Sequence, residues 1–304
     1  MAEKHPSRIL PVLLIVVVVI VAGVGAGVLY VVTHPKPTAA LQTVQVGDNV
    51  TVNYIGAFGS GAQNGRVFDT SLYAVAVNNQ TYPKSLEFAM RSPISEYTPL
   101  GVYVGPNAPS SGYSNDNITF GGVVTGFWQG LLGLPVNQTR TITVPPNLGY
   151  GSLVASCLVS MPLSVSVPVV SVVPAGNFST LYPNVSKAVG TEFLAPPYNW
   201  TAVVLSVNGT AVVVENLPSV GEAVLANGLR AVVSAISRST ITVSISLTAS
   251  DAGLVLGRSS ASVCSANQFI VQSVNPATGT FVANYNHEVV GQTLTFTVTV
   301  VRFY

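Results

Sequence analysis

The stretch GRVFDTS (65–71) places a carboxylate, Asp69, directly beside a large aromatic side chain, Phe68. Only 8% of the 304 residues are charged, so an acid in this apolar and hydroxyl-rich stretch requires an explanation. One interpretation is a solvated turn that Asp69 caps. The other is a buried acid that shapes an apolar pocket, in which a fixed carboxylate can orient polar groups of a substrate.

Strand signals surround this stretch. VTVNYIG (50–56) alternates apolar and polar residues with a period of two, which predicts a strand with one buried face. GSGAQNG (59–65) is a glycine-rich turn that predicts a hairpin into the second strand. Residues 72–117 form a long segment rich in Pro, Ser, Tyr and Asn, in which only SLEFAM (85–90) indicates a short element.

Three later segments carry further aromatic residues. GGVVTGFWQGLLGLPVN (121–137) contains Phe127 at helical spacing and ends in Gly and Pro, which predicts a short helix. RTITVPPNLGYG (140–151) predicts a strand, a Pro-Pro break and then Tyr150 between two glycines. TLTFTVTVV (293–301) alternates and predicts a final strand.

In this order and in these letters, the five segments resemble the FKBP-type peptidyl-prolyl cis-trans isomerases. That family carries V-x-Y-x-G, G-x-x-F-D-S/T-S, V-I-x-G-W/F-x-x-x-L, P-x-x-x-A/G-Y-G and a closing L-x-F-x-V-x-L. The matching residues are 43–71, 121–151 and 284–301. The resemblance implies an α+β fold in which a strongly curved antiparallel sheet wraps around one short helix. A cleft between sheet and helix would receive the substrate proline.

The resemblance also implies roles for individual residues. The implied catalytic residues are Tyr54, Asp69 and Tyr150, and the implied substrate-binding residues are Phe68, Val123, Val124, Phe127 and Phe296. Rotation about an X-Pro bond crosses a barrier of about 18–20 kcal/mol, because amide resonance is broken. A site that binds the twisted amide better than the planar one accelerates rotation without covalent chemistry, so no cofactor is expected. The alternative is that Tyr54 and Phe68 are ordinary core residues and Asp69 is a turn cap.

A long insertion separates the last two motifs. NYNHEVVGQTLTF (284–296) resembles the N-H-P-L-A-G-x-x-L-x-F of the SlyD-like branch, with Glu288 in place of the proline. In that branch an insert-in-flap domain binds unfolded chains and acts as a chaperone. We therefore predict a discontinuous isomerase domain, residues 43–151 plus 284–304, and an inserted β-rich domain, residues 152–283. This insert is longer and poorer in charge than that resemblance implies.

The inserted segment contains similar stretches. Residues 202–224 and 269–294 both place an apolar strand before SVN, a turn, a second strand with Asn and a Gly. Residues 229–247 are a third candidate hairpin. The pattern predicts a large all-β domain of stacked hairpins.

The N-terminus predicts a membrane anchor. The run from Ile9 to Val32 has no charged residue, and about 20 apolar residues in a helix cross a bilayer core. We expect a cytoplasmic tail (1–8), a transmembrane helix (9–33) and a linker (34–42), because Lys and Arg precede the run. A cleaved signal peptide, cut at Ala22-Gly23 or Gly25-Ala26, is the alternative.

The composition narrows the partners. A net charge of +1 gives no sign of nucleic-acid binding, and the three histidines are too scattered for a metal site. Cys157 and Cys264 would form one long-loop disulfide outside the cell, but two buried free thiols are equally compatible with the sequence. Eight N-x-S/T triplets make a glycosylated exterior plausible, at Asn49, Asn79, Asn117, Asn137, Asn177, Asn184, Asn199 and Asn208.

These observations favour a membrane-anchored, extracytoplasmic peptidyl-prolyl isomerase that acts on proline-containing unfolded or folding polypeptides, with chaperone activity from the insert. The low charge and the many triplets are typical of an archaeal surface protein. One alternative is a surface interaction or adhesin-like protein that keeps an FKBP fold as an inactive scaffold. Another is a structural surface protein of β-sandwich repeats.

Overall fold

The computed structural model describes residues 42–108 and 113–304. Residues 43–304 form one compact unit. The predicted cytoplasmic tail and transmembrane helix, with all but the last residue of the linker, lie outside the described residues. Within the part of the chain that the structure describes, no helix is long and apolar enough to cross a membrane.

Two separate hydrophobic cores organise this unit. One core draws its buried side chains from residues 44–144 and 289–300, and the other from residues 157–285. We call the part around the first core the discontinuous domain and the part around the second the inserted domain. The described chain is mostly β with few helices, as the sequence predicts.

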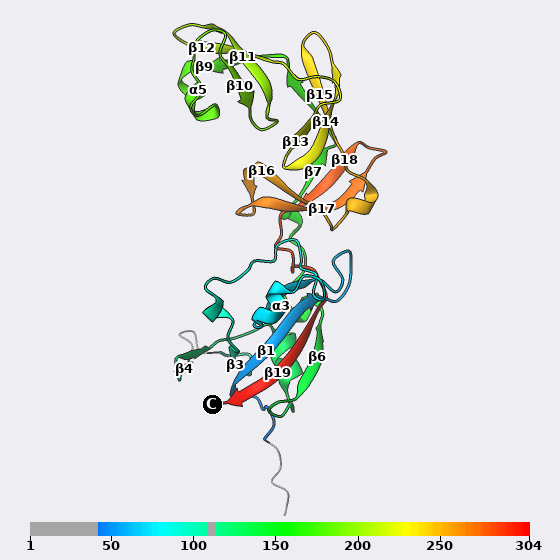
Figure 1. Cartoon of the computed structure of the whole chain (residues 1–304). Helices are drawn as coiled ribbons and strands as arrows, with labels where there is room; N and C mark the ends of the chain where they lie inside the picture. Colours follow the sequence, from blue (N-terminus) through cyan, green and yellow to red (C-terminus); the bar gives the residue numbers. More distant parts are fainter. Residues whose placement is uncertain (1–41, 109–112) are drawn as a thin grey trace, which may run out of the picture. The chain divides into compact units, whose positions relative to one another are not determined.

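The discontinuous domain is built on an antiparallel sheet. Its strands are β1 (Asn49–Phe58), β2 (Val67–Thr70), β3 (Leu100–Tyr103), β6 (Thr139–Val144) and β19 (Leu294–Phe303). The strand order is β2-β1-β19-β6. β3 pairs with residues 49–52 of β1, on the same edge on which β2 pairs with residues 55–57. Figure 1 shows β1, β19 and β6 side by side, although β19 ends the chain. Alternation explains both long strands, because every second residue of each faces the core.

Helix α4 (Thr125–Leu131) packs on β6 at very short range, and it is shorter than the predicted segment 121–137. A Cβ atom added at Gly130 would lie 2.4 Å from the side chain of Ile142, and one at Gly126 would lie 2.7 Å from Val144. The two glycines are four residues apart and so share one helix face. Arg140 donates hydrogen bonds to two carbonyl oxygens at the C-terminal end of α4, at 2.8 and 2.9 Å, which helps to end the helix there.

The long segment 72–117 holds only short elements. The remaining elements of the discontinuous domain are α3 (Tyr73–Val77), η2 (Ile94–Glu96), β4 (Tyr113–Asn115), β5 (Ile118–Phe120) and η3 (Pro146–Leu148). The expectation of an element over residues 85–90 is wrong, because these residues form neither helix nor strand. There the backbone N–H groups of Leu86 and Glu87 donate to side chains, of Gln63 and Glu288, instead of to a ladder.

The inserted domain consists of three four-stranded antiparallel sheets. The first contains β9 (Val170–Pro174), β10 (Glu192–Ala195), β11 (Trp200–Val207) and β12 (Ala211–Asn216). The second contains β8 (Ser164–Pro168), β13 (Ala223–Ala226), β14 (Leu229–Ile236) and β15 (Thr240–Ile245). The third contains β7 (Leu158–Pro162), β16 (Leu256–Val263), β17 (Ala266–Asn275) and β18 (Thr280–Asn284). Its helical turns are η4 (Ala155–Cys157), α5 (Ala175–Leu181) and η5 (Ala249–Asp251).

The three sheets repeat one design. The three predicted hairpins are present as β11–β12, β14–β15 and β17–β18, and the register of each pair shifts at the same place, around Leu205, Ser234 and Gln272. The fourth strand of each sheet comes from a six-residue repeat, LVSMPL-SVSVPV-VSVVPA (158–175), whose three strands pair with the three hairpins in reverse order. Hairpin similarity alone does not reveal this second repeat.

A disulfide joins Cys157 and Cys264, with 5.7 Å between their Cα atoms. Cys157 precedes β7 and Cys264 lies in the β16–β17 turn, so both belong to the third sheet. The bond therefore ties two parts of one sheet and does not join the two ends of the insert. Closing a loop of 107 residues stabilises the fold by about 4–5 kcal/mol in the chain-entropy model.

The predicted glycosylation positions differ in accessibility. Seven of the eight asparagines are exposed, namely Asn79, Asn117, Asn137, Asn177, Asn184, Asn199 and Asn208. Asn49 is the exception, because it lies in β1 with its Oδ1 buried, and Thr51 of the same triplet is only 2% exposed. The folded structure therefore disfavours glycosylation of Asn49. At the other seven positions, glycosylation stays a prediction.

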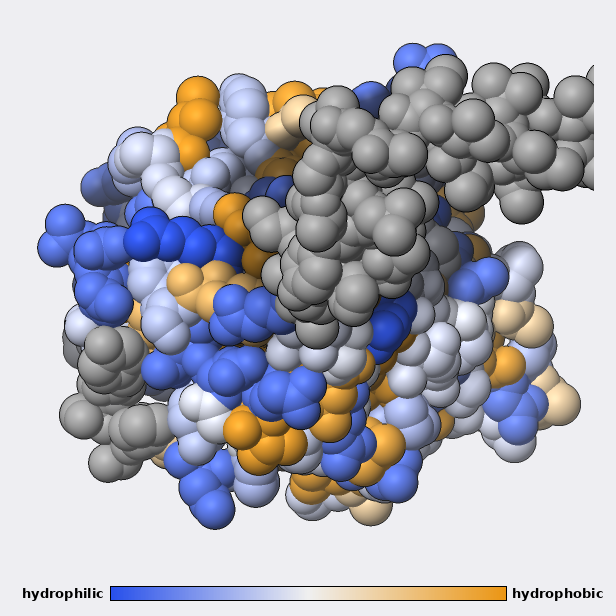
Figure 2. Space-filling view, turned by 90° about the horizontal axis from the view of Figure 1, so that it is seen from below, coloured by the Kyte–Doolittle hydropathy of each residue, from blue (hydrophilic) through white to orange (hydrophobic). Residues whose placement is uncertain are grey.

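Figure 2 shows one face of the molecule, on which apolar residues lie in small groups between hydrophilic ones. Scattered exposed apolar side chains are normal for a folded domain. On this face the described residues therefore give no argument for a particular partner.

Candidate active site

The residues Asp69, Thr70 and Ser71 all bind Tyr54. The hydroxyl of Tyr54 donates to Asp69 Oδ2, the hydroxyl of Thr70 donates to the carbonyl oxygen of Tyr54 at 2.8 Å, and the backbone N–H of Tyr54 donates to Ser71 Oγ at 2.9 Å. Thr70 and Ser71 are 1% and 2% exposed. The end of β2 thus fixes both the backbone and the hydroxyl of Tyr54 in β1, which explains the sequence DTS.

Arg91 completes this group, and the sequence-based prediction missed it. Its Nη2 donates to Asp69 Oδ1 at 2.7 Å and to the Tyr54 hydroxyl at 2.8 Å. Its own backbone N–H donates to the Tyr97 hydroxyl at 3.0 Å, and its guanidinium lies 5.6 Å from the Tyr97 ring centre. A signal did exist, because a partly buried acid needs a counter-ion. Segment 72–117 contains only two cations, Lys84 and Arg91.

The electrostatics keep Tyr54 protonated. Burial first, and then the adjacent Asp69 carboxylate, raise the pKa of Tyr54 well above its ordinary value. A phenol that holds its proton can donate it to the Asp69 carboxylate in a hydrogen bond. Asp69 accepts from two neutral donors, the Tyr54 hydroxyl and the Thr70 backbone N–H at 2.8 Å, and from one cation, Arg91, so its carboxylate is fixed in direction.

Edge-to-face aromatic pairs form the floor next to this group. Phe68 packs against Phe296 with ring centres 5.7 Å apart, Phe296 against Phe127 at 5.0 Å, and Phe127 against Tyr54 at 6.2 Å. Phe58, which the sequence did not single out, extends the row beyond Phe68 at 5.6 Å. Such pairs add about 0.5–1.5 kcal/mol each beyond the area that they bury. The floor is therefore a rigid apolar surface.

Close backbone approach sets the height of the floor. A Cβ atom added at Gly56 would lie 2.7 Å from the ring of Phe68 and 3.1 Å from that of Phe296. Gly56 pairs with both Asp69 and Phe296 across the sheet, so it lies at the centre of the site. Glycine is needed there because both rings rest on its backbone.

A cleft of about 420 Å³ lies above the floor. Its lining residues are Tyr54, Phe68, Asp69, Arg91, Leu100, Gly122, Val123, Val124, Phe127, Tyr150 and Phe296. The structure thus brings all eight predicted site residues together, from β1, β2, the segment before α4, α4 itself, the loop after η3 and β19. Arg91, Leu100 and Gly122 are the additions. The functional roles of these residues stay predictions.

Tyr150 differs from the other aromatic residues of the cleft. It is 48% exposed, and within the described residues its hydroxyl has no hydrogen-bond partner. Partial burial first, and then the Asp69 carboxylate, raise the pKa of Tyr150. The backbone of Gly151 has φ of +81° and its N–H donates to the carbonyl oxygen of Pro146, so the Pro-Pro break and the glycine position the tyrosine. Its hydroxyl is a free donor at the rim.

This arrangement suits non-covalent chemistry on an apolar, carbonyl-containing group. An apolar floor excludes water, a fixed carboxylate sets the field, and Tyr150 offers one hydrogen-bond donor. Within the described part of the chain, no three His, Cys, Asp or Glu side chains come together as a metal site. The cleft is formed by the residues for which the FKBP-type resemblance implies a proline-binding site.

Comparison with known proteins agrees with this geometry. Residues 110–175 match the family described as FKBP-type peptidyl-prolyl cis-trans isomerase. The chain is 31% identical over 111 residues to a short-type peptidyl-prolyl cis-trans isomerase of Methanocaldococcus jannaschii. The aligned stretch covers 36% of this chain and 53% of that relative. It is 31% identical over 117 residues to the mouse peptidyl-prolyl cis-trans isomerase FKBP10, which covers 38% of this chain and 13% of that protein.

The matches therefore concern one domain. The chain spans about half the length of the archaeal relative and a much smaller part of the mouse protein. The family match and these relatives support an FKBP-type peptidyl-prolyl isomerase domain and peptidyl-prolyl cis-trans isomerase activity.

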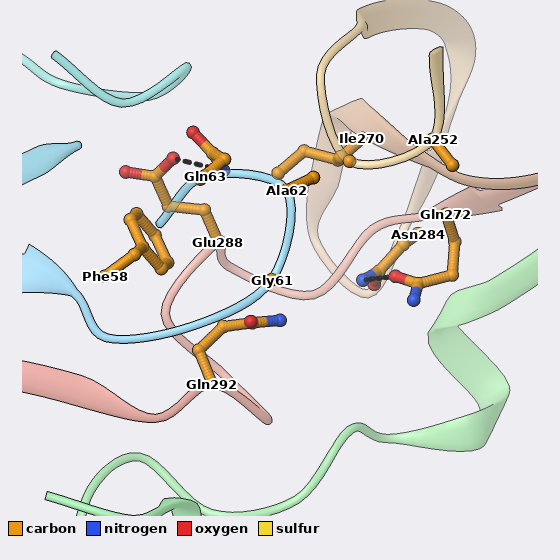
Figure 3. A pocket seen from close by; sticks show the side chains of 11 residues that line it. Phe58, Gly61, Ala62, Gln63, Ala252, Ile270, Gln272, Asn284, Glu288 and Gln292 are labelled. Atoms are coloured by element: carbon orange, nitrogen blue, oxygen red, sulfur yellow. Dashed lines mark hydrogen bonds between the residues drawn. The ribbon is translucent and has the colours of Figure 1, made fainter. Parts of the chain in front are cut away.

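Glu288, which replaces the proline of the SlyD-like pattern, lies beside the cleft. It is 5% exposed, and its carboxylate accepts hydrogen bonds from the Ser85 hydroxyl at 2.5 Å, the Glu87 N–H at 3.1 Å and the Gln63 amide at 3.5 Å. Figure 3 shows Gln63 and Glu288 pointing toward one another. One buried acid thus joins the β1–β2 turn, the segment around residues 85–87 and the chain that returns from the inserted domain.

We expect Glu288→Gln to change the pH dependence of stability. Burial raises the pKa of Glu288 above its ordinary value of 4.5, and the hydrogen bonds from Ser85 and from the Glu87 backbone only partly oppose this. At pH values between 4.5 and the raised pKa, Glu288 is therefore still protonated in the folded state but has lost its proton in the unfolded chain. The stabilising contribution is complete below that window and is lost as the pH rises through it. As the pH rises above 4.5, the variant should gain unfolding free energy relative to wild type, because glutamine does not titrate.

Denaturant unfolding across this range measures the effect. Glu192→Gln, at an exposed position in β10, is the matched control and should follow the wild-type curve. Parallel curves for wild type and Glu288→Gln would contradict the assignment of a buried, proton-binding carboxyl group.

Proposed function

We propose that this protein is a membrane-anchored, extracytoplasmic peptidyl-prolyl cis-trans isomerase that acts on proline-containing unfolded or folding polypeptides. The observation that carries the proposal is the cleft itself. It joins an aromatic floor, a free tyrosine hydroxyl and a carboxylate held by Tyr54 and Arg91.

The proposed mechanism is preferential binding of the twisted amide. The substrate proline ring rests on Phe68, Phe127 and Phe296, where water that favours the planar, polar amide is excluded. Tyr150 donates to a carbonyl oxygen of the substrate. Asp69 faces the rotating carbonyl group with a fixed field, because Tyr54 and Arg91 hold its two oxygens. No step requires a cofactor.

Two conservative substitutions test this mechanism. Tyr150→Phe removes a hydroxyl that has no partner in the described protein, so kcat/KM for a proline peptide should fall about threefold to tenfold while Tm stays unchanged. Asp69→Asn keeps the size but removes the charge, so kcat/KM should fall at least as much. The cost in stability should be about 1 kcal/mol or less, because the Asp69 carboxylate is half exposed. Tyr182→Phe, in the inserted domain, should leave kcat/KM unchanged.

The measurement is a peptide isomerisation assay on the full-length chain in mild detergent. Full activity in both cleft variants would exclude the proposed roles. An inactive wild-type protein would favour the alternative, an FKBP fold kept as a scaffold for surface interactions.

The SlyD-like branch and a chaperone role for the insert are part of the proposal. The insertion begins just after Tyr150 and returns just before the NYNHEVVG motif, which is where that branch carries its extra domain. The first sheet of the inserted domain also carries several apolar side chains on its outer face, which they share with Glu192, Glu215 and Thr201. The outward residues of this sheet include Val170, Val172, Leu194, Val203 and Val213, of which Val172 is 70% and Leu194 65% exposed.

The six-residue repeat shows how unusual this face is. The position of Val172 in β9 is occupied by Ser166 in β8 and by Ser160 in β7, and all three are exposed. The other two sheets thus keep a polar residue where the first has an apolar one. Extended apolar segments of unfolded clients are the partner that such a face fits.

Val172→Ser, combined with Leu194→Ser, should weaken suppression of aggregation of an unfolded client protein by about half or more, because both side chains are exposed and apolar. Folding should change by about 0.5 kcal/mol or less, as is usual for surface positions. Val46→Ser, at a 62% exposed valine of the discontinuous domain, is the control. Equal suppression by wild type and the double variant would refute a chaperone surface here.

The membrane anchor and the external location are supported by the sequence and by the disulfide. Structural disulfides are typical of oxidising compartments outside the cytoplasm. Protease added to intact cells should therefore digest the part from residue 43 onward while the first eight residues stay protected. A soluble mature chain released by signal peptidase would refute the anchor.

A further inference from the structure

A second cavity adjoins the candidate active site. It has a volume of about 530 Å³, and Phe68, Asp69 and Tyr150 line both it and the cleft. Its other walls come from two segments, one that contains Glu87 and one that begins at His287. Two cavities that share three side chains are neighbouring compartments of one surface depression.

A polypeptide substrate must extend beyond its proline. Each residue of an extended chain spans about 3.3–3.6 Å. The wall between the two cavities is one side chain thick, so substrate residues on its two sides are only one or two positions apart in the bound polypeptide. When the proline occupies the cleft, a side chain within two positions of it therefore reaches the second cavity. The cavity belongs to the path of the substrate.

The charges in this cavity do not cancel. The Asp69 carboxylate is paired with Arg91, and the Glu288 carboxylate is buried among three donors. Glu87 has no lysine or arginine partner among the described residues. Its Oε2 accepts from the Glu288 backbone N–H at 3.2 Å and lies 3.9 Å from Nε2 of His287, whose side chain is 68% exposed. Within the described chain, no donor is in hydrogen-bond contact with Glu87 Oε1, and no Lys or Arg lines the cavity.

The apolar walls complete the description. Phe68, Val289 and Val290 line the same cavity as Glu87. A lysine or arginine side chain has an aliphatic stem that packs on apolar surface and a charged end that seeks a carboxylate. An acidic side chain would meet repulsion from Glu87, and an aliphatic one would leave that carboxylate unpaired.

We propose that the second cavity is a substrate subsite for a lysine or arginine side chain within two residues of the isomerised proline, with Glu87 as the specificity-determining residue. The inference rests on the proposed isomerase function and adds a sequence preference to it.

The test uses peptides with a variable five-residue stretch centred on one proline, with Leu, Lys or Glu placed singly at each of the two positions before and the two positions after it. Wild-type full-length protein in mild detergent should show, for at least one position, kcat/KM for Lys about threefold or more above that for Leu, and Glu lowest. High salt should reduce the difference, because the carboxylate is partly solvent-accessible. The Lys-to-Leu ratio at that position should fall to about one in Glu87→Gln.

Two further variants separate specificity from damage. Glu87→Asp keeps the charge and should restore part of the ratio, whereas Glu192→Gln should keep the full wild-type ratio. No preference for Lys at any position, or an unchanged ratio in Glu87→Gln, would overturn the subsite while leaving the isomerase function intact. If the all-Leu peptide is not turned over, the proposed function fails, and equilibrium binding of fluorescent Lys and Leu peptides then decides the subsite by the same ratio.

Discussion

The site depends on the way in which the end of β2 holds Tyr54. Three consecutive side chains, Asp69, Thr70 and Ser71, bind the hydroxyl, the carbonyl oxygen and the N–H of this one residue. A strand pair normally fixes only the backbone of its neighbour, but here the hydroxyl is fixed as well. A buried hydrogen-bonding group that loses its partner costs about 1–3 kcal/mol. These hydrogen bonds therefore disfavour other positions of Tyr54 as well as stabilising the one observed. The direction of the Asp69 carboxylate follows from it.

The rest of the cleft depends on glycine. Gly56 lets two aromatic rings rest on the backbone of β1, and Gly126 and Gly130 let α4 approach β6 to the same degree. The helix carries Phe127 and the sheet carries Phe296, so the distance between helix and sheet sets the 5.0 Å separation of these two rings. Residues without a side chain thus determine the shape of an aromatic site.

Elements that depend on local sequence patterns could be predicted, whereas contacts between segments far apart in the sequence could not. The alternation in β1 and β19, the helix around Phe127 and the position of Tyr150 all follow from periodicity or from Gly and Pro, and the structure brings the eight predicted residues to one cleft. Arg91 was missed because its role depends on a contact with a residue 22 positions away, which no local pattern of the sequence encodes. Segment 85–90 was mistaken for an element because side chains satisfy its backbone. The pairing of β7, β8 and β9 with three separate sheets was missed because the sequence of a six-residue repeat does not indicate which hairpin each of its strands pairs with.

The second cavity lies beside the point at which the chain leaves for the inserted domain and returns from it. The chain leaves the discontinuous domain after Gly151 and returns before Gly291, and these two crossing segments are tied together. The Gly291 N–H donates to the Gly151 carbonyl oxygen at 2.8 Å, and the Asn286 side chain binds both backbone groups of Val154. The returning segment is therefore held in place and carries Glu288 and the apolar wall into fixed positions beside Tyr150. This wall of the second cavity is formed by the returning segment, residues 287–290, which lies between the inserted domain and β19, so the point of insertion determines which residues stand beside Tyr150.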